Sequence, residues 1–405
     1  MAEPAGSGHR GRLRAYVTAM TAYPDGFIWG TATAAHQVEG GNWNNDWWAW
    51  ENNPDSGCAE PSGDACNHWD LYEHDLDLLA GFGFNAYRFS IEWSRIEPED
   101  GLWSRSAIDH YRKVCEACLA RGVTPMVTFH HFTTPRWVAH HGGWEEPTTA
   151  DRFAVFAHRA AEQLADVMRY AFTFNEPNMV ATHGYLTGGF PPGRRDAALR
   201  RAVNDIFIDA HHKTRDAIKA AAPNVPVGLT LAMQDNQAVE GGEPYRDRVQ
   251  RNLEDVFLEA ARGDDFIGVQ CYTRARFGPE GNMRPEAGVP LTQMGYEVWP
   301  EALEVCIRRA HGVTDGVPVI VTENGIGTSD DDQRIDYIQR ALQGVRNCIE
   351  DRIDVRGYVY WSLLDNFEWA LGYEPTFGLV EVDRHTFERR PKKSAQWLGQ
   401  IAADS

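Results

Sequence analysis

The chain has 405 residues, of which 43% are hydrophobic, and its formal net charge at pH 7 is −19. This length and apolar fraction are typical of a globular protein with a substantial core, and α/β barrels of this size often form one domain. The negative charge disfavours nucleic acid or an anionic membrane as the main partner, and no apolar stretch approaches the roughly 18 residues that a membrane span requires.

The first 21 residues differ in composition from the rest of the chain. They contain glycine, serine and arginine but no continuous apolar segment, so they do not have the pattern of a secretory signal. We interpret residues 1–21 as a disordered leader, with Met20 as an alternative start, and residues 22–405 as one domain.

The chain has seven cysteines, an odd number scattered along its length. Cys115 and Cys118 form a C-x-x-C motif within a predicted helix, but no second pair of cysteines or histidines follows at the spacing of a zinc site. We therefore expect a reduced, cytoplasmic protein that needs no metal ion or other cofactor.

Eight short runs of β-forming residues recur along the chain at intervals. Several are almost continuously apolar, as expected for parallel strands that are buried on both faces. The predicted strands are 27–32, 85–91, 124–130, 170–174, 225–231, 266–272, 317–322 and 357–363.

Segments with helical periodicity lie between these strands. Segment 69–82 places its apolar side chains on one face and ends at Gly81 and Gly83. A second helix is expected to begin at a cap formed by Thr148 and Thr149. Eight strand-then-helix units without a break in composition predict a single (β/α)8 TIM barrel. The main alternative is a doubly wound sheet, which favours a glycine-rich phosphate turn that the sequence lacks.

A (β/α)8 barrel places its functional residues at the carboxyl ends of the strands. Polar or aromatic residues occur at seven of the eight predicted ends, and the fifth strand offers no candidate. The candidates are Gln37 and Glu39, Arg88, His131, Asn175 and Glu176, Tyr272, Glu323, and the segment from Trp361 to Trp369.

Two of these candidates are glutamates that follow the fourth and seventh strands. Glu176 precedes Pro177, which we expect to hold it in extended geometry, and Glu323 precedes an Asn-Gly pair. Either residue alone could be an ordinary loop glutamate. Together they provide what cleavage of a glycosidic bond with retention requires, which is a protonated acid and an ionised nucleophile.

The neighbouring candidates assign a role to each glutamate. Arg88 and Tyr272 are placed to reach Glu323, where a cation and a hydroxyl donor should lower its pKa and keep it ionised. Glu176 would face that negative charge, so its pKa should be raised and it should act as the general acid. Arg88 could instead form a structural ion pair.

Tryptophans and histidines are concentrated near several strand ends. Indole rings usually pack in the core, but their faces also stack on the apolar faces of sugar rings. The histidine doublets share no metal-ligand spacing, and only His131 lies at a strand end. The tryptophans in question are Trp43, Trp47, Trp48, Trp50, Trp361 and Trp369.

From about residue 27 to 391 the chain resembles glycoside hydrolase family 1, the β-glucosidase-like enzymes of the 4/7 (β/α)8 superfamily. Five motifs in the family's order carry the resemblance: residues 27–40, 87–96, 173–177, 321–325 and 361–369. The resemblance implies an exo-acting, retaining β-glycosidase, with a β-glucosidase as the first expectation, that acts on β-glycosides or oligosaccharides by double displacement.

The resemblance also implies a role for each site residue. Glu176 would be the acid/base, Glu323 the nucleophile, and Arg88 and Tyr272 its partners. The residues that would hold the sugar are Gln37, His131, Asn175, Trp361, Glu368 and Trp369, with Asn175 on the 2-hydroxyl.

The chain departs from the family pattern at Phe132, usually tryptophan, and at Gln270, usually asparagine. Three alternative functions are considered: a 6-phospho-β-glycosidase, a transglycosidase and an inactive sugar-binding barrel. A carboxylate at Glu368 would repel a 6-phosphate, and retention of both glutamates disfavours an inactive protein. The preferred sugar, its leaving group and the oligomeric state stay open.

Overall fold

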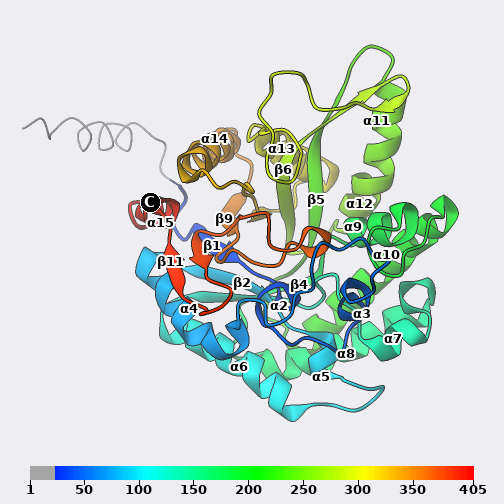
Figure 1. The fold of residues 1–405 in the computed structure, drawn as a ribbon, viewed down its shortest axis with the longest axis vertical. Helices are drawn as coiled ribbons and strands as arrows, with labels where there is room; N and C mark the ends of the chain where they lie inside the picture. The colour runs from blue at the N-terminus through cyan, green and yellow to red at the C-terminus, as the bar shows by residue number, and fades with distance from the viewer. Residues whose placement is uncertain (1–22) are drawn as a thin grey trace, which may run out of the picture.

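The computed structural model describes residues 23–405, which form a closed parallel barrel of eight strands surrounded by helices (Figure 1). The strands follow the order β5-β4-β3-β2-β1-β9-β8-β6, and β5 pairs with β6 to close the ring. This confirms the (β/α)8 fold. The predicted leader and Met20 lie outside the described residues. The barrel strands are β1 (Ile28–Ala32), β2 (Ala86–Ser90), β3 (Thr124–Thr128), β4 (Tyr170–Asn175), β5 (Val227–Ala238), β6 (Phe266–Gly278), β8 (Val319–Glu323) and β9 (Val355–Trp361).

Helices connect consecutive strands and cover the outside of the barrel. None of the helices within residues 23–405 is long and apolar enough to cross a membrane. The helical elements are α2 (Ala35–Val38), α3 (Asp46–Glu51), α4 (His68–Phe82), α5 (Trp93–Ile96), α6 (Arg105–Ala120), α7 (Arg136–His140), η1 (Gly143–Glu145), α8 (Thr148–Leu164), α9 (Pro177–Thr182), η2 (His183–Thr187), α10 (Ala197–Ala221), α11 (Glu243–Gln250), η3 (Arg251–Asp255), α12 (Val256–Ala260), α13 (Ala302–Val313), α14 (Asp331–Glu350), η4 (Trp369–Leu371) and α15 (Lys393–Ala403).

Of two helix ends predicted from the local sequence, one is present as predicted in the structure and the other is not. The predicted helix 69–82 is present as α4, and Gly83 ends it with a φ of 99°, which glycine adopts without strain. The predicted cap at Thr148 and Thr149 is wrong. Helix α8 begins at Thr148 itself, and its N-cap is Pro147, whose ring fixes a helical φ of −56° without a side-chain cap.

Strands β5 and β6 are longer than predicted. They contain 12 and 13 residues and stay paired over Asp235–Ala238 and Arg274–Phe277, beyond the closed part of the barrel. A short antiparallel strand, β7 (Gly281–Asn282), turns back on β6. This extension rises above the barrel beside α11 and forms one side of its carboxyl-terminal rim (Figure 1).

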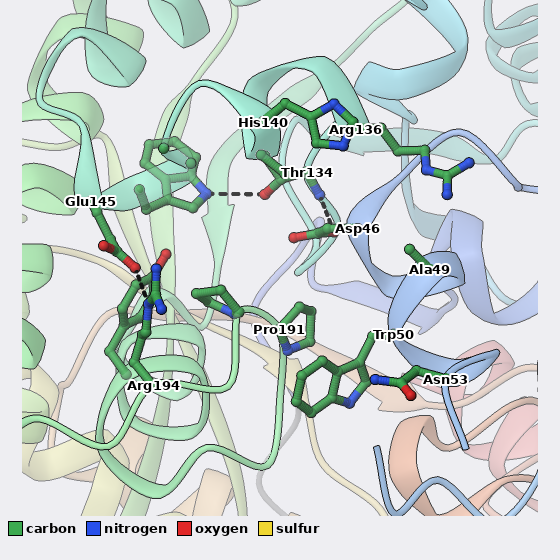
Figure 2. Close-up of a pocket in the computed structure, with 16 residues that line it drawn as sticks. Asp46, Ala49, Trp50, Asn53, Thr134, Arg136, His140, Glu145, Pro191 and Arg194 are labelled. Atoms are coloured by element: carbon green, nitrogen blue, oxygen red, sulfur yellow. Dashed lines mark hydrogen bonds and ion pairs between the residues drawn. The ribbon is translucent and has the colours of Figure 1, made fainter. Parts of the chain in front are cut away.

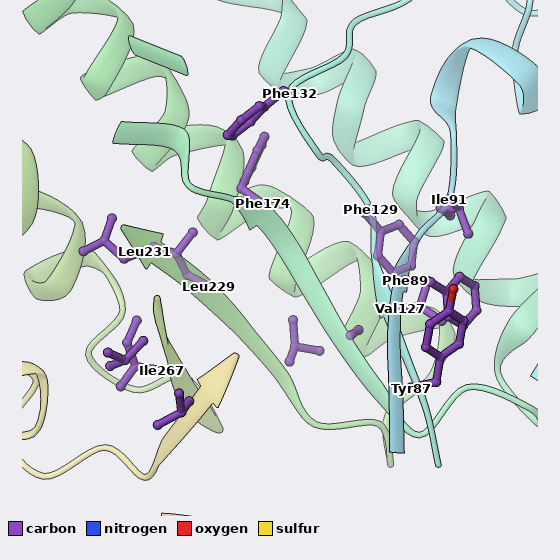
Figure 3. Close-up of a cluster of buried hydrophobic side chains, with 14 of the residues drawn as sticks. Tyr87, Phe89, Ile91, Val127, Phe129, Phe132, Phe174, Leu229, Leu231 and Ile267 are labelled. Carbon is purple, nitrogen blue, oxygen red and sulfur yellow. The ribbon is translucent and has the colours of Figure 1, made fainter. Parts of the chain in front are cut away.

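The core has two parts, one between the sheet and the helices and one inside the barrel. Figure 3 shows the outer part, where Val127 in β3 and Phe129 just beyond its end, and Leu229 and Leu231 in β5, repeat at every second position. Inside the barrel lies a smaller apolar cluster that includes Phe172 and fills the space below the polar residues. The two smaller strands, β10 (Val380–Val382) and β11 (Arg389–Pro391), pair outside the barrel.

All seven cysteines are free. Cys115 and Cys118 lie buried in α6, where burial raises the pKa of the Cys115 thiol to about 12. A thiol with so high a pKa does not ionise at neutral pH, so the C-x-x-C motif has the properties of core packing.

Two helical glycines provide a test of packing between α15 and α4. A Cβ at Gly399 would lie 2.0 Å from the carbonyl oxygen of Phe82, whereas one at Gly81 would meet no atom within 4 Å. We expect Gly399→Ala to lower the free energy of unfolding by about 1–3 kcal/mol. Gly81→Ala should raise it by about 0.5–1 kcal/mol, because alanine favours the helix. Urea denaturation would measure both, and a Gly399→Ala protein as stable as the wild type would contradict the packing.

Candidate active site

The predicted site residues meet at the carboxyl-terminal end of the barrel, except Glu39, which pairs with Arg95 at 2.8 Å and accepts from the Tyr111 hydroxyl. Asn175 is the last residue of β4 and Glu323 the last residue of β8. Just before these positions β4 has one extra residue relative to β5, and β8 has one extra residue relative to β6, so the strand pairing shifts by one residue at each point. A bulge of this kind redirects the next side chain. The bulge in β4 explains why the Phe174 side chain packs outside the barrel while the Asn175 side chain contacts residues inside it.

Glu323 is held by both of its carboxyl oxygens. Arg88 Nη1 donates to Oε1 at 2.6 Å, and the Tyr272 hydroxyl donates to Oε2 at 2.6 Å. Arg88 and Glu323 are 1% and 4% exposed. Both contacts that the sequence predicts are therefore present, and they fix the carboxyl group in one orientation.

Glu176 occupies the turn between β4 and α9. Its φ of 45° and ψ of 56° lie in the left-handed region, so the predicted extended geometry is wrong. The reason is that the chain turns from strand to helix at this single residue. Its N–H donates to the Thr230 carbonyl at 3.0 Å, and its own carbonyl accepts from Met179 N at 2.9 Å. A non-glycine residue held in this region costs about 1–3 kcal/mol, as often occurs at functional sites.

The two glutamates differ in their electrostatic surroundings. Burial raises the pKa of Glu176 well above its ordinary value, the charges of Glu323 and Glu368 add to the rise, and Arg88 opposes it. Burial also raises the pKa of Glu323, although Arg88, Tyr272 and Gln270 act to lower it. The expectation of a lowered pKa for Glu323 is therefore wrong, because loss of solvation outweighs these partners. Hydrogen-bond donors hold only Glu323, so the first negative charge of the pair resides there.

The Asn175 amide is fixed by a network that includes two residues absent from the predicted site. Its Oδ1 accepts from Arg88 Nη2 at 2.6 Å, Gln270 Nε2 at 2.9 Å and Thr230 Oγ1 at 3.3 Å. Its Nδ2 therefore points away from these donors and donates to His131 Nε2 at 3.2 Å. Thr230 is the polar residue in the otherwise apolar start of β5. Gln270 lies two positions before Tyr272, on the same face of β6.

Gln37 and His131 present polar atoms that lack partners. Gln37 Nε2 donates to the Phe367 carbonyl at 2.7 Å and to Asn366 Oδ1 at 3.1 Å, which leaves its Oε1 buried without a partner. His131 Nδ1 is likewise buried without a partner, and burial lowers the pKa of this histidine well below its ordinary value. A neutral His131 that accepts from Asn175 carries its proton on Nδ1, so it can donate to a ligand.

Trp361, Glu368 and Trp369 complete the site. Trp361 Nε1 donates to Glu368 Oε1 at 3.2 Å, yet burial raises the pKa of Glu368 to about 8. The His131 ring lies nearly parallel to both indoles, with centroids 5.8 Å from Trp361 and 6.1 Å from Trp369. Such a mixture of aromatic surface and unsatisfied polar groups suits a ligand with many hydroxyl groups.

The structure shows where the aromatic residues noted in the sequence lie, and it adds one that the sequence did not predict. Trp43 is 60% exposed, whereas Trp47 is buried with its ring 4.6 Å from Trp369. Phe132 has a φ of 70° and packs 4.9 Å from Trp369. Tyr296, in the loop before α13, was not predicted. Burial and the nearby charges of Glu368 and Glu176 raise its pKa, and no periodicity or motif marks it in the sequence.

Comparison with known proteins gives a consistent result. A model of glycosyl hydrolase family 1 matches residues 19–261 and 265–405. The chain is 30% identical to β-glucosidase A of Thermotoga maritima, over 95% of this chain and 98% of that protein. It is 32% identical to the thermostable β-glucosidase B of Thermobispora bispora, over 94% and 90%. The solved structure of a β-glycosidase from Pyrococcus horikoshii superposes with a TM-score of 0.88 at 36% identity, over 94% and 95%.

Because the Glu176 carboxyl is buried, the free energy of unfolding should depend on pH. The pKa of Glu176 is raised in the folded state, so the unfolded state releases this proton at lower pH, and stability falls as the pH rises above about 4.3. Glu176→Gln keeps the shape but removes the charge, so it should melt at a higher temperature than the wild type at pH 7. That gain should disappear near pH 4.

Calorimetric melting across this pH range would measure the difference between the two proteins. Glu240→Gln, at an exposed glutamate, serves as the matched control and should show no gain that depends on pH. A constant difference between Glu176→Gln and the wild type at all pH values would contradict the role of the buried charge.

Proposed function

The chain belongs to glycosyl hydrolase family 1, and on this basis we propose that it is a retaining, exo-acting β-glucosidase that removes terminal β-D-glucosyl residues from the non-reducing ends of β-glycosides. The observation that carries the proposal is that two buried carboxyl groups differ in the hydrogen-bond donors around them. Glu323 is held by Arg88 and Tyr272, whereas no hydrogen-bond donor within residues 23–405 reaches the Glu176 carboxyl.

In the first step, Glu323 attacks the anomeric carbon while the bond to the leaving oxygen breaks. Glu176 gives its proton to that oxygen, so the aglycone departs as a neutral alcohol. The contacts from Arg88 and Tyr272 orient the attacking carboxylate. The raised pKa of Glu176 keeps its proton in place until the oxygen needs it.

In the second step, water attacks the anomeric carbon from the side that the aglycone left. Glu176, now ionised, takes a proton from this water, and Glu323 departs as a carboxylate. Arg88 stabilises the charge that returns to Glu323. Two inversions at the same carbon leave the product in the β configuration.

The surrounding residues would bind the sugar and strengthen their contacts in the transition state. With its Oδ1 occupied by three donors, the Asn175 amide offers an N–H to the 2-hydroxyl, a contact that gains strength as positive charge develops at the ring. Gln37 Oε1 and His131 Nδ1 are unpaired and would bind other hydroxyls. The names of the relatives favour glucose as the sugar.

The 6-phospho-β-glycosidase alternative is disfavoured because no cation among the described residues acts on Glu368. The reason given from the sequence, repulsion of the phosphate by an ionised Glu368, does not apply. Because burial raises the pKa of Glu368 to about 8, its carboxyl is largely protonated at neutral pH. The charged groups that act on Glu368 are those of Glu323 and Asp365, both acidic, and a phosphate requires cations. Transglycosylation would use the same covalent intermediate with a sugar alcohol in place of water.

The organisation of the protein is part of the same proposal. We place one catalytic domain over residues 22–405. The seven free cysteines support a reducing compartment, so we propose a cytoplasmic location.

The nucleophile is tested by removing its carboxyl group. Glu323→Ala should lower the turnover of nitrophenyl β-glucoside by about 10⁴-fold or more. Added azide or formate should restore activity by entering the vacated space, and the product with azide should be the α-glycosyl azide, read by NMR. Glu240→Ala is the control. Near-wild-type activity of Glu323→Ala would contradict the assignment.

The pH profile tests the acid. Activity should rise as Glu323 loses its proton and fall as Glu176 loses its own, and both limbs should lie above the ordinary carboxyl range, because burial raises both pKa values. With dinitrophenyl glucoside, whose leaving group needs no proton, Glu176→Ala should stay active at high pH and lose the alkaline limb. Burial also raises the pKa of Glu368, to about 8, so Glu368→Gln is added to Glu176→Ala, and an alkaline limb that persists in the double variant would contradict Glu176 as the source of that limb.

A further inference from the structure

A second hollow, of about 320 Å³, opens beside the active site on the same end of the barrel (Figure 2). We call it the lateral pocket. Helices α3 and α7, the turn η1 and the segment 191–194 line it, and these elements follow β1, β3 and β4. Trp47 and Phe190 stand between the two pockets, since Trp47 lies 4.8 Å from Phe190 and 4.6 Å from Trp369.

Asp46 places a fixed carboxyl group in the lateral pocket. Its Oδ1 accepts from the backbone N–H groups of Trp47 at 2.9 Å and Thr134 at 2.8 Å. Its Oδ2 has no hydrogen-bond partner in the part of the chain that the structure describes. Figure 2 shows this carboxyl directed from α3 toward Thr134, in the middle of the hollow. Burial raises the pKa of Asp46 to about 7, as expected for a carboxyl that lacks a cationic partner.

Trp50 forms an aromatic wall beside Asp46. The two residues are four positions apart on α3, so they share one face of the helix. Gly193 lies against the indole, because a Cβ there would come within 2.8 Å of the ring, and this contact holds the ring in place. Trp50 Nε1 is buried without a partner, and Pro191 lies beside the ring in Figure 2.

One ion pair and one guanidinium without an ion-pair partner among the described residues line the lateral pocket beside Asp46. Glu145 and Arg194 form an ion pair at 2.6 Å and cancel each other. Among the described residues Arg136 has no ion-pair partner, and it is not among the groups that act on Asp46, where the one side-chain charge is that of Glu92. Because burial raises its pKa to about 7, the Asp46 carboxyl is partly protonated at neutral pH, so it can donate a hydrogen bond as well as accept one. An apolar wall, a carboxyl oxygen, a guanidinium and an indole N–H match a neutral ligand that has an apolar face and hydroxyl groups at its edge.

We propose that the lateral pocket is a second saccharide-binding site, which takes a neutral pyranose through Trp50, Asp46 and Arg136. This inference extends the proposed function and rests on it. A volume of about 320 Å³ lies at the small end of ligand pockets, so it fits one or two sugar units. The sugar would be either the far end of an oligosaccharide bound in the active site or a separate sugar molecule.

Calorimetric titration tests the site directly. In the Glu176→Gln/Glu323→Gln protein, cellobiose should bind at two sites. Adding Trp50→Ala should remove one of them or weaken it by about tenfold or more. Trp43→Ala is the matched control, since Trp43 is an exposed indole in the same segment and does not line the pocket. Arg136→Ala tests the same site from a different helix and guards against misfolding of the Trp50 variant.

The outcomes of the titration separate the two proposals. Binding that neither Trp50→Ala nor Arg136→Ala changes would overturn the second site, whatever happens at the glutamates. Binding that disappears entirely with Trp50→Ala would support the second site and contradict sugar binding at Glu176 and Glu323, and with it the proposed function.

Kinetics in the active protein identify the source of the sugar. If the site holds the far end of a chain, Trp50→Ala should raise KM for cellotetraose by about tenfold and leave nitrophenyl β-glucoside unchanged. If it holds a separate sugar, both KM values should stay unchanged, and added glucose should alter the wild-type rate but not that of the variant. Identical behaviour of variant and wild type in all these assays would overturn the proposal.

Discussion

Three buried carboxyl groups, those of Glu176, Glu323 and Glu368, lie close enough to act on one another, and Arg88 supplies the positive charge that acts on both catalytic candidates. A buried carboxylate without a partner is costly, and one guanidinium can compensate one negative charge. Arg88 and Tyr272 direct that charge to Glu323. The other two carboxyls then keep their protons, and this distribution is what a retaining glycosidase requires of its acid and its nucleophile. Because Arg88 lies over the ring of Phe172, the apolar filling of the barrel supports this arrangement from below.

The sequence predicted the barrel because the signals for it are local. Buried strands are continuous apolar runs, and the helix ending at Gly83 is marked by its own residues. The glutamates were found because both follow such a run. What could not be predicted depends on pairing between distant strands. The extra residues in β4 and β8, which place Asn175 and Glu323, are visible only in the register with β5 and β6. The net pKa of Glu323 depends on burial, which no motif encodes.

The pocket also concentrates backbone strain. Glu176, Phe132 and Trp369 have φ values of 45°, 70° and 54°, although none of them is glycine. Each lies where the chain leaves a barrel strand and turns at the carboxyl-terminal end of the barrel. Such residues persist only where the surroundings determine them. Here the surroundings are the closed barrel and its two-part core. The packing of the barrel therefore offsets the free-energy cost of the unfavourable backbone conformations at its carboxyl-terminal end.

Helix α3 joins the active site to the lateral pocket. Asp46 and Trp50 lie on one face of this short helix, and Trp47, on the neighbouring face, packs against Trp369. The helix is anchored because its N-cap residue Asn45 accepts from Trp48 N at 2.8 Å. A ligand that presses on Asp46 and Trp50 therefore acts on the same rigid turn that supports Trp369. Neighbouring faces of this one helix therefore contribute to the lateral pocket and to the packing around Trp369, and a ligand in the lateral pocket would act on the turn that carries Trp47.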